Sequence, residues 1–220
     1  MRGFCRFLLD CVFPRTCVSC RSFTGGRLVC DLCRARIVRA DAQVSLPGPS
    51  SPDVISPFLE GDVLLDIVRF LKFEGGQAVA GWLGTEMASA LEAHLRKGCD
   101  AVIVPVPLHW TRLARRGYDQ AGLLAAEVSR QTGIPLRRGV LGRCRRTKAQ
   151  SGLDRGSKSS NVEGAFRLRS AGRIRDRDVV LVDDLVTTGE TVLACCRALS
   201  GAGPASVTVL CAGRARTGKN

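Results

Sequence analysis

The chain has 220 residues, of which 45% are hydrophobic, so it can bury one sizeable core with a small appendage and is too apolar for a disordered chain. Its net charge of +13 favours a polyanionic partner such as nucleic acid, a phosphorylated metabolite or an acidic membrane surface, the plain alternative being a basic face that only aids solubility. No stretch approaches the ~20 apolar residues that span a bilayer, so no membrane span is expected.

The N-terminal segment, residues 2–12, is predicted to form a short amphipathic helix that covers the core, the alternative being a docking or membrane-surface helix. No secretory signal is visible there, because the apolar run Phe7-Leu8-Leu9 is short and Asp10 interrupts it. We therefore expect a cytoplasmic protein. In reducing surroundings, paired cysteines indicate a metal site more often than a disulfide.

Two Cys-x-x-Cys pairs follow, separated by nine residues: Cys17, Cys20, Cys30 and Cys33. Such pairs place four thiolates tetrahedrally, so we predict structural zinc here in preference to an iron–sulfur cluster or free thiols. A closed site of this kind stabilises a fold too small to hold itself. The predicted order is a helix and zinc ribbon over 1–40, a Pro- and Ser-rich linker over 41–57, and the main domain over 58–220.

The main domain alternates between helical and strand-like apolar patterns. Helices are predicted over 63–73, 78–95, 116–132 and 190–200, and strands over 101–107, 136–141, 165–168, 179–182 and 206–211. Residues 143–175 are polar and strongly basic, and much of this segment is predicted to be a mobile loop. Strands that alternate with helices indicate an α/β fold with a doubly wound parallel sheet.

The most informative segment runs from Val179 to Thr191 and reads Val-Val-Leu-Val-Asp-Asp-Leu-Val-Thr-Thr-Gly-Glu-Thr. A strand buried on both faces delivers Asp183 and Asp184 at its carboxyl end, where open α/β sheets bind ligands. The turn after it opens a helix, and its N–H groups, hydroxyls and helix dipole suit one phosphate. That turn consists of Thr187, Thr188, Gly189, Glu190 and Thr191.

The two acids suit a hydroxyl-rich neighbour or a magnesium ion rather than the phosphate itself. A ribose 5-phosphate meets both needs. The nucleotide-triphosphate loop Gly-x-x-x-x-Gly-Lys-Ser/Thr does not occur in the sequence, so that class of site is not supported. The plain alternative is a strand, turn and helix in which the acids only cap the helix.

Residues 179–191 resemble the signature of type I phosphoribosyltransferases, which bind 5-phosphoribosyl 1-diphosphate with magnesium. The resemblance implies that Asp183 and Asp184 hold the ribose hydroxyls as catalytic residues, and that the turn up to Thr191 holds the 5′-phosphate. A four-cysteine module ahead of such a domain resembles the layout of the ComF family, which is linked to DNA uptake in competent bacteria. Segments 71–73, 104–108, 115–120, 145–150 and 161–166 also resemble ComF blocks.

One position departs from the ComF pattern: Asp119 stands where the family usually has Asn. An added negative charge beside Arg115 and Arg116 is expected to weaken the binding of a diphosphate. His109 lies near the same predicted site, and a lone histidine is more often structural than a base, so no role is assigned to it.

Transfer from this donor would break the bond between the anomeric carbon and diphosphate through a loose, oxocarbenium-like transition state. Magnesium is the expected cofactor, because it neutralises the leaving diphosphate. Backbone N–H groups of the loop from Pro105 to His109, which begins with Pro105 and Val106, are predicted to bind the diphosphate, together with charge from Arg115 and Arg116. The loop with Arg145 and Arg146 is predicted to close over it. A solvated basic face is the alternative for each arginine.

Three functions remain open on the sequence. The first is a phosphoribosyl-diphosphate-binding protein of competence, with competence-machinery proteins and single-stranded DNA as partners, the DNA held by its backbone charge. Base stacking is less supported, since Trp82, Trp110 and Tyr118 are the only Trp or Tyr residues. The second is a working phosphoribosyltransferase on a nitrogenous acceptor, favoured by the intact acid pair. The third is a domain that senses the metabolite without chemistry.

Overall fold

The computed structural model describes residues 16–40, 43–46, 51–74, 76–96, 98–144 and 164–216. The predicted helix at 2–12, Arg145 and Arg146, and most of the predicted basic loop lie outside the described residues. None of the described helices is long and apolar enough to cross a membrane.

A mostly parallel sheet forms the centre of the main domain, with strand order β1-β2-β8-β7-β4 and β3 also paired to β8. Only the β1–β2 pair in this sheet is antiparallel. A separate antiparallel hairpin, β5–β6, packs against α7 (Glu190–Ser200). The strands are β1 Val44–Ser45, β2 Asp53–Ile55, β3 Phe58–Leu59, β4 Ala101–Pro105, β5 Leu141–Arg143, β6 Phe166–Leu168, β7 Asp178–Val186 and β8 Ser206–Arg214.

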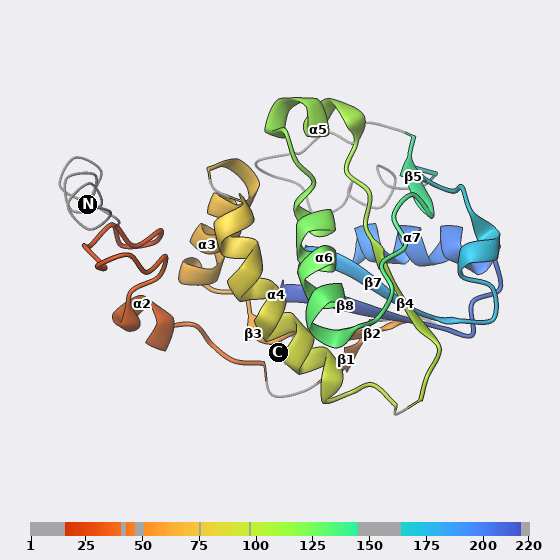
Figure 1. The fold of residues 1–220 in the computed structure, drawn as a ribbon, viewed down its shortest axis with the longest axis horizontal. Helices are drawn as coiled ribbons and strands as arrows, with labels where there is room; N and C mark the ends of the chain where they lie inside the picture. The colour runs from red at the N-terminus through yellow and green to blue at the C-terminus, as the bar shows by residue number, and fades with distance from the viewer. Residues whose placement is uncertain are drawn as a thin grey trace, which may run out of the picture.

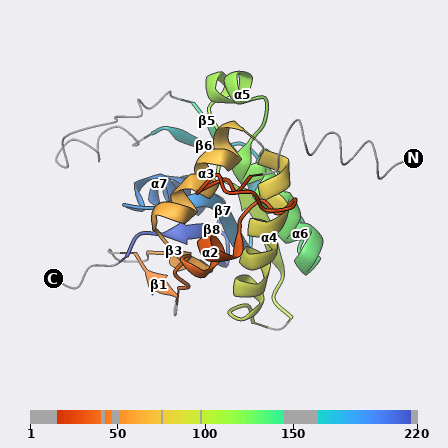
Figure 2. The ribbon, with the colours of Figure 1, turned by 90° about the vertical axis from the view of Figure 1, so that its left-hand side faces the viewer.

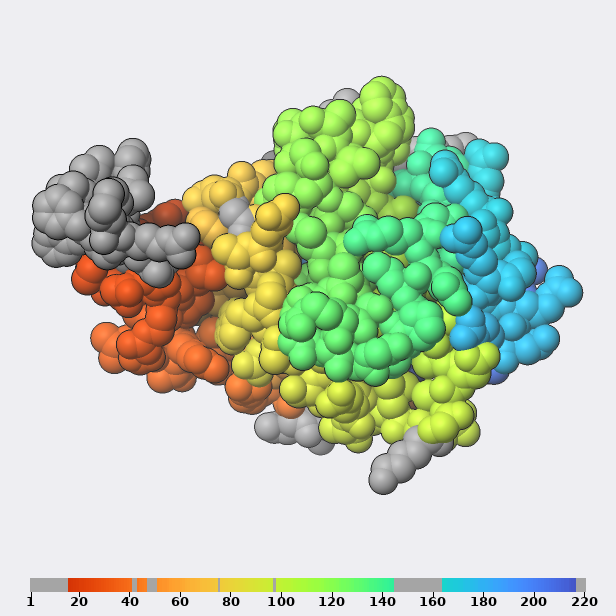
Figure 3. All heavy atoms as spheres, viewed as in Figure 1, coloured from red at the N-terminus to blue at the C-terminus, as the bar shows by residue number. Residues whose placement is uncertain are grey.

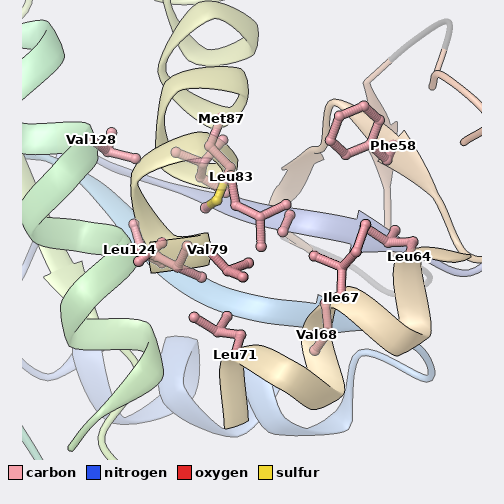
Figure 4. Packing of buried hydrophobic residues seen from close by; sticks show 14 of the residues in the cluster. Phe58, Leu64, Ile67, Val68, Leu71, Val79, Leu83, Met87, Leu124 and Val128 are labelled. Atoms are coloured by element: carbon pink, nitrogen blue, oxygen red, sulfur yellow. The ribbon is translucent and has the colours of Figure 1, made fainter. Parts of the chain in front are cut away.

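Helices cover both faces of this sheet, as the doubly wound prediction requires (Figure 1). The helices are α2 Asp31–Ala35, α3 Asp62–Phe73, α4 Gly76–Glu92, α5 Trp110–Arg116, α6 Gln120–Thr132, α7 and a short 3₁₀ turn at Ala171–Arg173. α3, α4 and α6 pack on one face, where Figure 4 shows Leu71, Val79, Leu83 and Leu124 meeting. α7 packs on the other face.

Strand β7 contributes side chains alternately to the two cores, because successive strand residues point to opposite faces. Val180 and Val182 join the core under α3, α4 and α6. Val179 and Leu181 join the core under α7. All four are buried, which confirms the prediction of a strand covered on both sides. The strand also runs on to Val186 and therefore includes both acids.

The helix predicted over 116–132 is confirmed as α6, but its predicted start is four residues too early, because Arg116 ends α5 and the helical conformation breaks before Gln120. α5 ends at Arg116, and Gly117 follows with a left-handed φ of 77°. α6 begins at Gln120, after Asp119 in extended conformation. A glycine just past a helix end and an acid before the next one are ordinary boundary signals. The break turns the chain so that α5 projects from the top of the molecule (Figure 3).

The segment predicted as a linker, 41–57, contains β1 and β2, and β2 pairs in parallel with β8. Val54 and Ile55 are buried there, so apolar burial outweighs the neighbouring prolines. The strand predicted over 136–141 is displaced to Leu141–Arg143, while Leu136 makes one isolated bridge to Ile103. The four-cysteine segment and α2 lie beside α3 in both views (Figures 1 and 2).

Candidate functional site

Asp183 and Asp184 lie at the carboxyl end of β7, where the parallel sheet opens toward solvent. Asp183 is half-buried and Asp184 is 5% exposed. The backbone N–H of Asp184 donates to Oδ1 of Asp183 at 2.8 Å. Burial, and then repulsion from Asp184, raise the pKa of Asp183 to about 7. The pair therefore sits in surroundings that oppose two full negative charges, which a hydroxyl donor or a cation would relieve.

The turn after β7 encloses a small hollow of about 30 Å³, lined by Asp183 and the run from Leu185 to Val192. Thr187 and Thr188 are exposed, and α7 begins at Glu190. Gly189 has a left-handed φ of 78°, and a Cβ there would lie 2.9 Å from Cδ2 of Leu46. The backbone conformation therefore favours glycine, and any larger residue would also have to displace the end of the Leu46 side chain. Amides and hydroxyls at the start of a helix suit a phosphate-sized anion.

A larger cleft of about 300 Å³ adjoins this hollow, because Asp183, Leu185 and Thr191 line both. Its walls bring together four cations and the two acids. The lining residues are Lys72, Val106, Pro107, Leu108, Arg112, Arg116, Gln120, Arg143, Asp183, Asp184, Leu185 and Thr191. The cleft thus places four cations beside the hollow at the start of α7, and Asp183 lines both.

Lys72, in the last turn of α3, is the cation closest to the acid pair. Its Nζ lies 3.1 Å from Oδ1 of Asp184, and the Lys72 side chain is 25% exposed. Oδ2 of Asp184 is buried and has no hydrogen-bond partner among the described residues. A buried carboxylate oxygen left in this state is costly, so it is suited to a hydroxyl or a hard metal ion. This is the observation that fits magnesium at the site.

Two arginines of the cleft rest on aromatic rings. The guanidinium of Arg116 lies 4.7 Å from the ring centroid of Phe73, and Nη1 of Arg116 donates to Oε1 of Gln120 at 3.1 Å. The guanidinium of Arg143 lies 5.2 Å from the ring of Phe166. Burial lowers the pKa of both arginines. Partly desolvated guanidinium groups gain most from an anionic ligand.

The residues predicted to bind the diphosphate do not all line the cleft. Val106 and Arg116 line the cleft, whereas Arg115 is exposed and Pro105 is buried in β4. The N–H of Val106 is used by the sheet, since it donates to the carbonyl of Val182 at 2.9 Å. Pro105 and Pro107 carry no N–H. Of the backbone N–H groups predicted to bind a diphosphate, only those of Leu108 and His109 are therefore left.

His109, to which the sequence assigned no role, caps α5 in the structure. It is 6% exposed and stands before α5, where its Nδ1 accepts from the backbone N–H of Thr111. Asp119 precedes α6, and its Oδ2 lies 2.6 Å from where a Cβ on Gly122 would be. It is not among the cleft-lining residues. Burial raises the pKa of Asp119.

The sequence did not single out Lys72, Arg112, Arg143 or Gln120 as site residues. Lys72 belongs to the segment 71–73 that resembles a ComF block, and this was a usable signal. Arg112 and Arg143 stand in basic stretches where no local pattern separates them from their neighbours. Their convergence depends on how the chain folds.

The four predicted zinc ligands come together. Their sulfur atoms all lie within 4.8 Å of one another, with Cys17 and Cys33 buried. The sulfurs of Cys20 and Cys30 are 3.6 Å apart. Zn–S bonds of ~2.3 Å in a tetrahedron separate the sulfurs by about 3.8 Å. Four thiolates at this spacing fit a structural zinc ion, since soft sulfur donors select it.

The sequence of this chain is similar to those of several known proteins. Residues 113–220 match the phosphoribosyl transferase domain family. Competence protein F of Haemophilus influenzae is 38% identical over 131 residues, which cover 57% of this chain and 57% of that protein. DNA utilization protein YhgH of Escherichia coli is 38% identical over 109 residues, which cover 50% of this chain and 47% of that protein.

Among solved structures, a purine phosphoribosyltransferase from Pyrococcus horikoshii is similar with a TM-score of 0.37 and 20% identity, covering 60% of this chain and 73% of that chain. The chain spans about half the length of the curated relatives it matches.

Proposed function

We propose that this chain, which belongs to the ComF family and has a type I phosphoribosyltransferase-like fold with a four-cysteine module, binds 5-phosphoribosyl 1-diphosphate with magnesium. One observation carries the proposal: the hollow at the start of α7 and the cationic cleft share Asp183, Leu185 and Thr191. A ligand with a single phosphate at one end, a diphosphate at the other and hydroxyls between them matches that order.

Each part of the ligand has a set of residues suited to it. Thr187, Thr188 and the N-terminus of α7 would hold the 5′-phosphate, since amides and hydroxyls gather there. Asp183 and Asp184 would accept hydrogen bonds from the ribose hydroxyls. The diphosphate would face the cations of the larger cleft, which are Lys72, Arg112, Arg116 and Arg143.

The two aspartates would also hold magnesium, which when bound supplies charge neutralisation for a diphosphate leaving group. The chain's own contribution is electrostatic. Partly buried arginines give stronger hydrogen bonds to an anion than exposed ones, because less water competes with them. The four cations line the same walls as Val106 and Leu108, so apolar side chains help to exclude water from the anomeric carbon.

Calorimetric titration with 5-phosphoribosyl 1-diphosphate and magnesium tests the proposal. Binding by the native chain and its loss in Asp183→Asn/Asp184→Asn are expected. Asp176→Asn is the matched control, because Asp176 is exposed, lies just before β7 and has a φ of 57° that Asn tolerates well. Ribose 5-phosphate and inorganic diphosphate, titrated separately, test binding in the hollow at the start of α7 and in the cationic cleft, respectively. A folded, zinc-loaded native chain that binds none of the three would refute the proposal.

Transfer of the ribose 5-phosphate to a nitrogenous acceptor is the second candidate. The acid pair lines the cleft, and the buried Oδ2 of Asp184 lacks a hydrogen-bond partner among the described residues, a need that a substrate hydroxyl would meet. Release of diphosphate that depends on an added acceptor, and that Asp184→Asn abolishes, is the expected signature. Slow release that no acceptor accelerates would argue for a binding or sensing role instead.

Single-stranded DNA is a further proposed partner, favoured by the surface of α5. Trp82 stacks on Phe58 and Tyr118 bonds to the backbone of Leu71, whereas Trp110 is 70% exposed. An exposed indole beside Arg112 and Arg115 suits a base and its phosphate. Fluorescence anisotropy with an oligonucleotide should show binding that weakens steeply with salt. Trp110→Ala should weaken it at every salt concentration, and an unchanged affinity would exclude α5 as the platform.

The biological setting belongs to the same proposal. The names of two relatives refer to competence and to DNA utilization, and we infer a cytoplasmic role beside proteins of the DNA-uptake machinery. Retention of the chain by tagged competence proteins in a cytoplasmic fraction is the corresponding measurement.

A further inference from the structure

Helix α3 contacts the four-cysteine module and contributes Lys72 to the cleft. Its middle and its end face the module, while Lys72 in its last turn reaches Asp184. Figures 1 and 2 show the module lying along α3 from two directions. One helix of 12 residues therefore connects two sites that the sequence places in separate domains.

Two polar contacts join the module to α3. Oγ of Ser19 donates to Oδ2 of Asp66 at 2.8 Å in a partly buried setting. Arg21 lies 3.9 Å from the carboxylate of Glu74, the residue that caps the helix, and both side chains are about half exposed or more. An exposed ion pair contributes little, so the Ser19–Asp66 hydrogen bond is the more significant of the two.

Apolar packing supports the same contact. Cys17 and Val18 belong to one buried cluster with Ile67 and Leu71 of α3. Ser19 stands between Cys17 and Cys20, two of the four sulfur ligands. A metal ion bound by both cysteines fixes the backbone of this knuckle, and with it the direction of the Ser19 hydroxyl.

A helix of this length is marginal in water on its own, so tertiary contacts must fix its position. For α3 these are packing in the main-domain core beside α4 and the contacts with the module. On the other side, the hydroxyl of Tyr118 donates to the carbonyl of Leu71 at 2.7 Å. Tyr118 thus holds the last turn of α3 through Leu71, while the module holds the helix through Asp66 and through the buried cluster that includes Leu71. Lys72 has a long flexible side chain, so its ammonium meets Asp184 reliably only if the turn that carries it is fixed.

We propose that the four-cysteine module positions Lys72 against Asp184 through α3, so that metal binding by the module strengthens ligand binding in the cleft. Ser19 is a positioning residue in this arrangement, since it touches Asp66 and not the ligand. The proposal rests on the proposed binding of 5-phosphoribosyl 1-diphosphate in the cleft.

A double-mutant cycle tests whether Ser19 acts through Lys72. The affinity for 5-phosphoribosyl 1-diphosphate with magnesium is measured by calorimetry in the zinc-loaded full chain. Ser19→Ala should weaken binding about three- to tenfold, Ser19→Thr should restore much of it, and Ser19→Ala should have no further effect in a Lys72→Gln background. Thr24→Val is the control, because the hydroxyl of Thr24 bonds to the carbonyl of Arg27 within the module.

Unchanged affinity in Ser19→Ala, or equal weakening in both Lys72 backgrounds, would overturn the proposal. Native protein that fails to bind the ligand would instead refute the proposed function. Hydrogen exchange decides the case if Lys72→Gln abolishes binding. Ser19→Ala and zinc removal should both speed exchange in the last turn of α3 while leaving α7 unchanged, and equal protection of α3 would overturn the coupling.

Discussion

The backbone N–H of Asp184 donates to Oδ1 of Asp183 at 2.8 Å, so the two neighbouring acids are linked within the strand that carries them. This hydrogen bond lowers the pKa of Asp183, but burial and the charge of Asp184 outweigh it and raise the pKa to about 7. The raised pKa marks a carboxyl whose surroundings disfavour its negative charge, and a hydroxyl donor or a cation beside it would relieve this.

The first prediction is a pH-dependent gain in stability for Asp183→Asn. An unfolded aspartate ionises near pH ~3.9, so between that pH and about 7 the folded chain holds the proton that the unfolded chain has lost. Rising pH therefore costs the native protein stability across this window. The melting temperature of Asp183→Asn should exceed that of the native chain by a margin that grows from about pH 4 to about pH 7 and then levels.

The expected margin is on the order of 1 kcal/mol or more, since one pKa unit corresponds to ~1.36 kcal/mol. Thermal unfolding in a buffer series measures it. A margin that stays constant with pH, or a variant that is less stable at neutral pH, would contradict the raised pKa assigned to Asp183.

The second prediction separates two neighbouring arginines of α5. Arg116 lines the cleft and rests on Phe73, whereas Arg115 is exposed and does not line it. Arg116→Ala should weaken binding of 5-phosphoribosyl 1-diphosphate about tenfold or more, because a partly buried charge-assisted bond is lost. Arg115→Ala removes the same charge and should change affinity by about twofold at most. Equal losses in calorimetry would mean that only the general positive field matters.

The local part of this site could be predicted from the sequence, because residues 179–191 are contiguous and carry their own strand, turn and helix signals. Lys72 lies in segment 71–73, whose resemblance to a ComF block could have pointed to it. Arg112 and Arg143 could not be predicted, since charge and spacing do not tell which of many basic residues a fold will bring together. The strand β2 was not predicted from the sequence for a related reason. Its three residues stand among prolines, and their pairing with β8 depends on a partner at the far end of the chain.

The third prediction concerns the cysteine cluster. Cys33→Ser removes a buried ligand and should abolish stoichiometric zinc in elemental analysis. The melting temperature should fall as well, because zinc binding supplies folding free energy and the module shares a core with α3 and α4. Cys99→Ser is the control, since Cys99 lies outside the cluster. Full zinc content in Cys33→Ser, or loss of zinc in Cys99→Ser, would contradict the assigned ligand set.

The fourth prediction compares two glycines of α4. A Cβ on Gly76 would lie 2.3 Å from Cε2 of Tyr118, whereas a Cβ on Gly81 would meet nothing within 4 Å. Gly81→Ala should therefore stabilise the chain by ~0.5–1 kcal/mol, since alanine lowers the entropy of the unfolded chain and favours the helix. Gly76→Ala should destabilise it by about 1–3 kcal/mol, the usual cost of overpacking.

Gly76→Ala should also affect the cleft, because the ring that it displaces belongs to Tyr118, whose hydroxyl holds the carbonyl of Leu71 beside Lys72. Chemical denaturation gives the two stabilities, and calorimetry gives the affinities for 5-phosphoribosyl 1-diphosphate. The affinity should fall in Gly76→Ala and stay constant in Gly81→Ala. If Gly76→Ala loses stability but binds normally, then Tyr118 does not govern the position of Lys72, and α3 is anchored by its packing in the main-domain core and by the four-cysteine module.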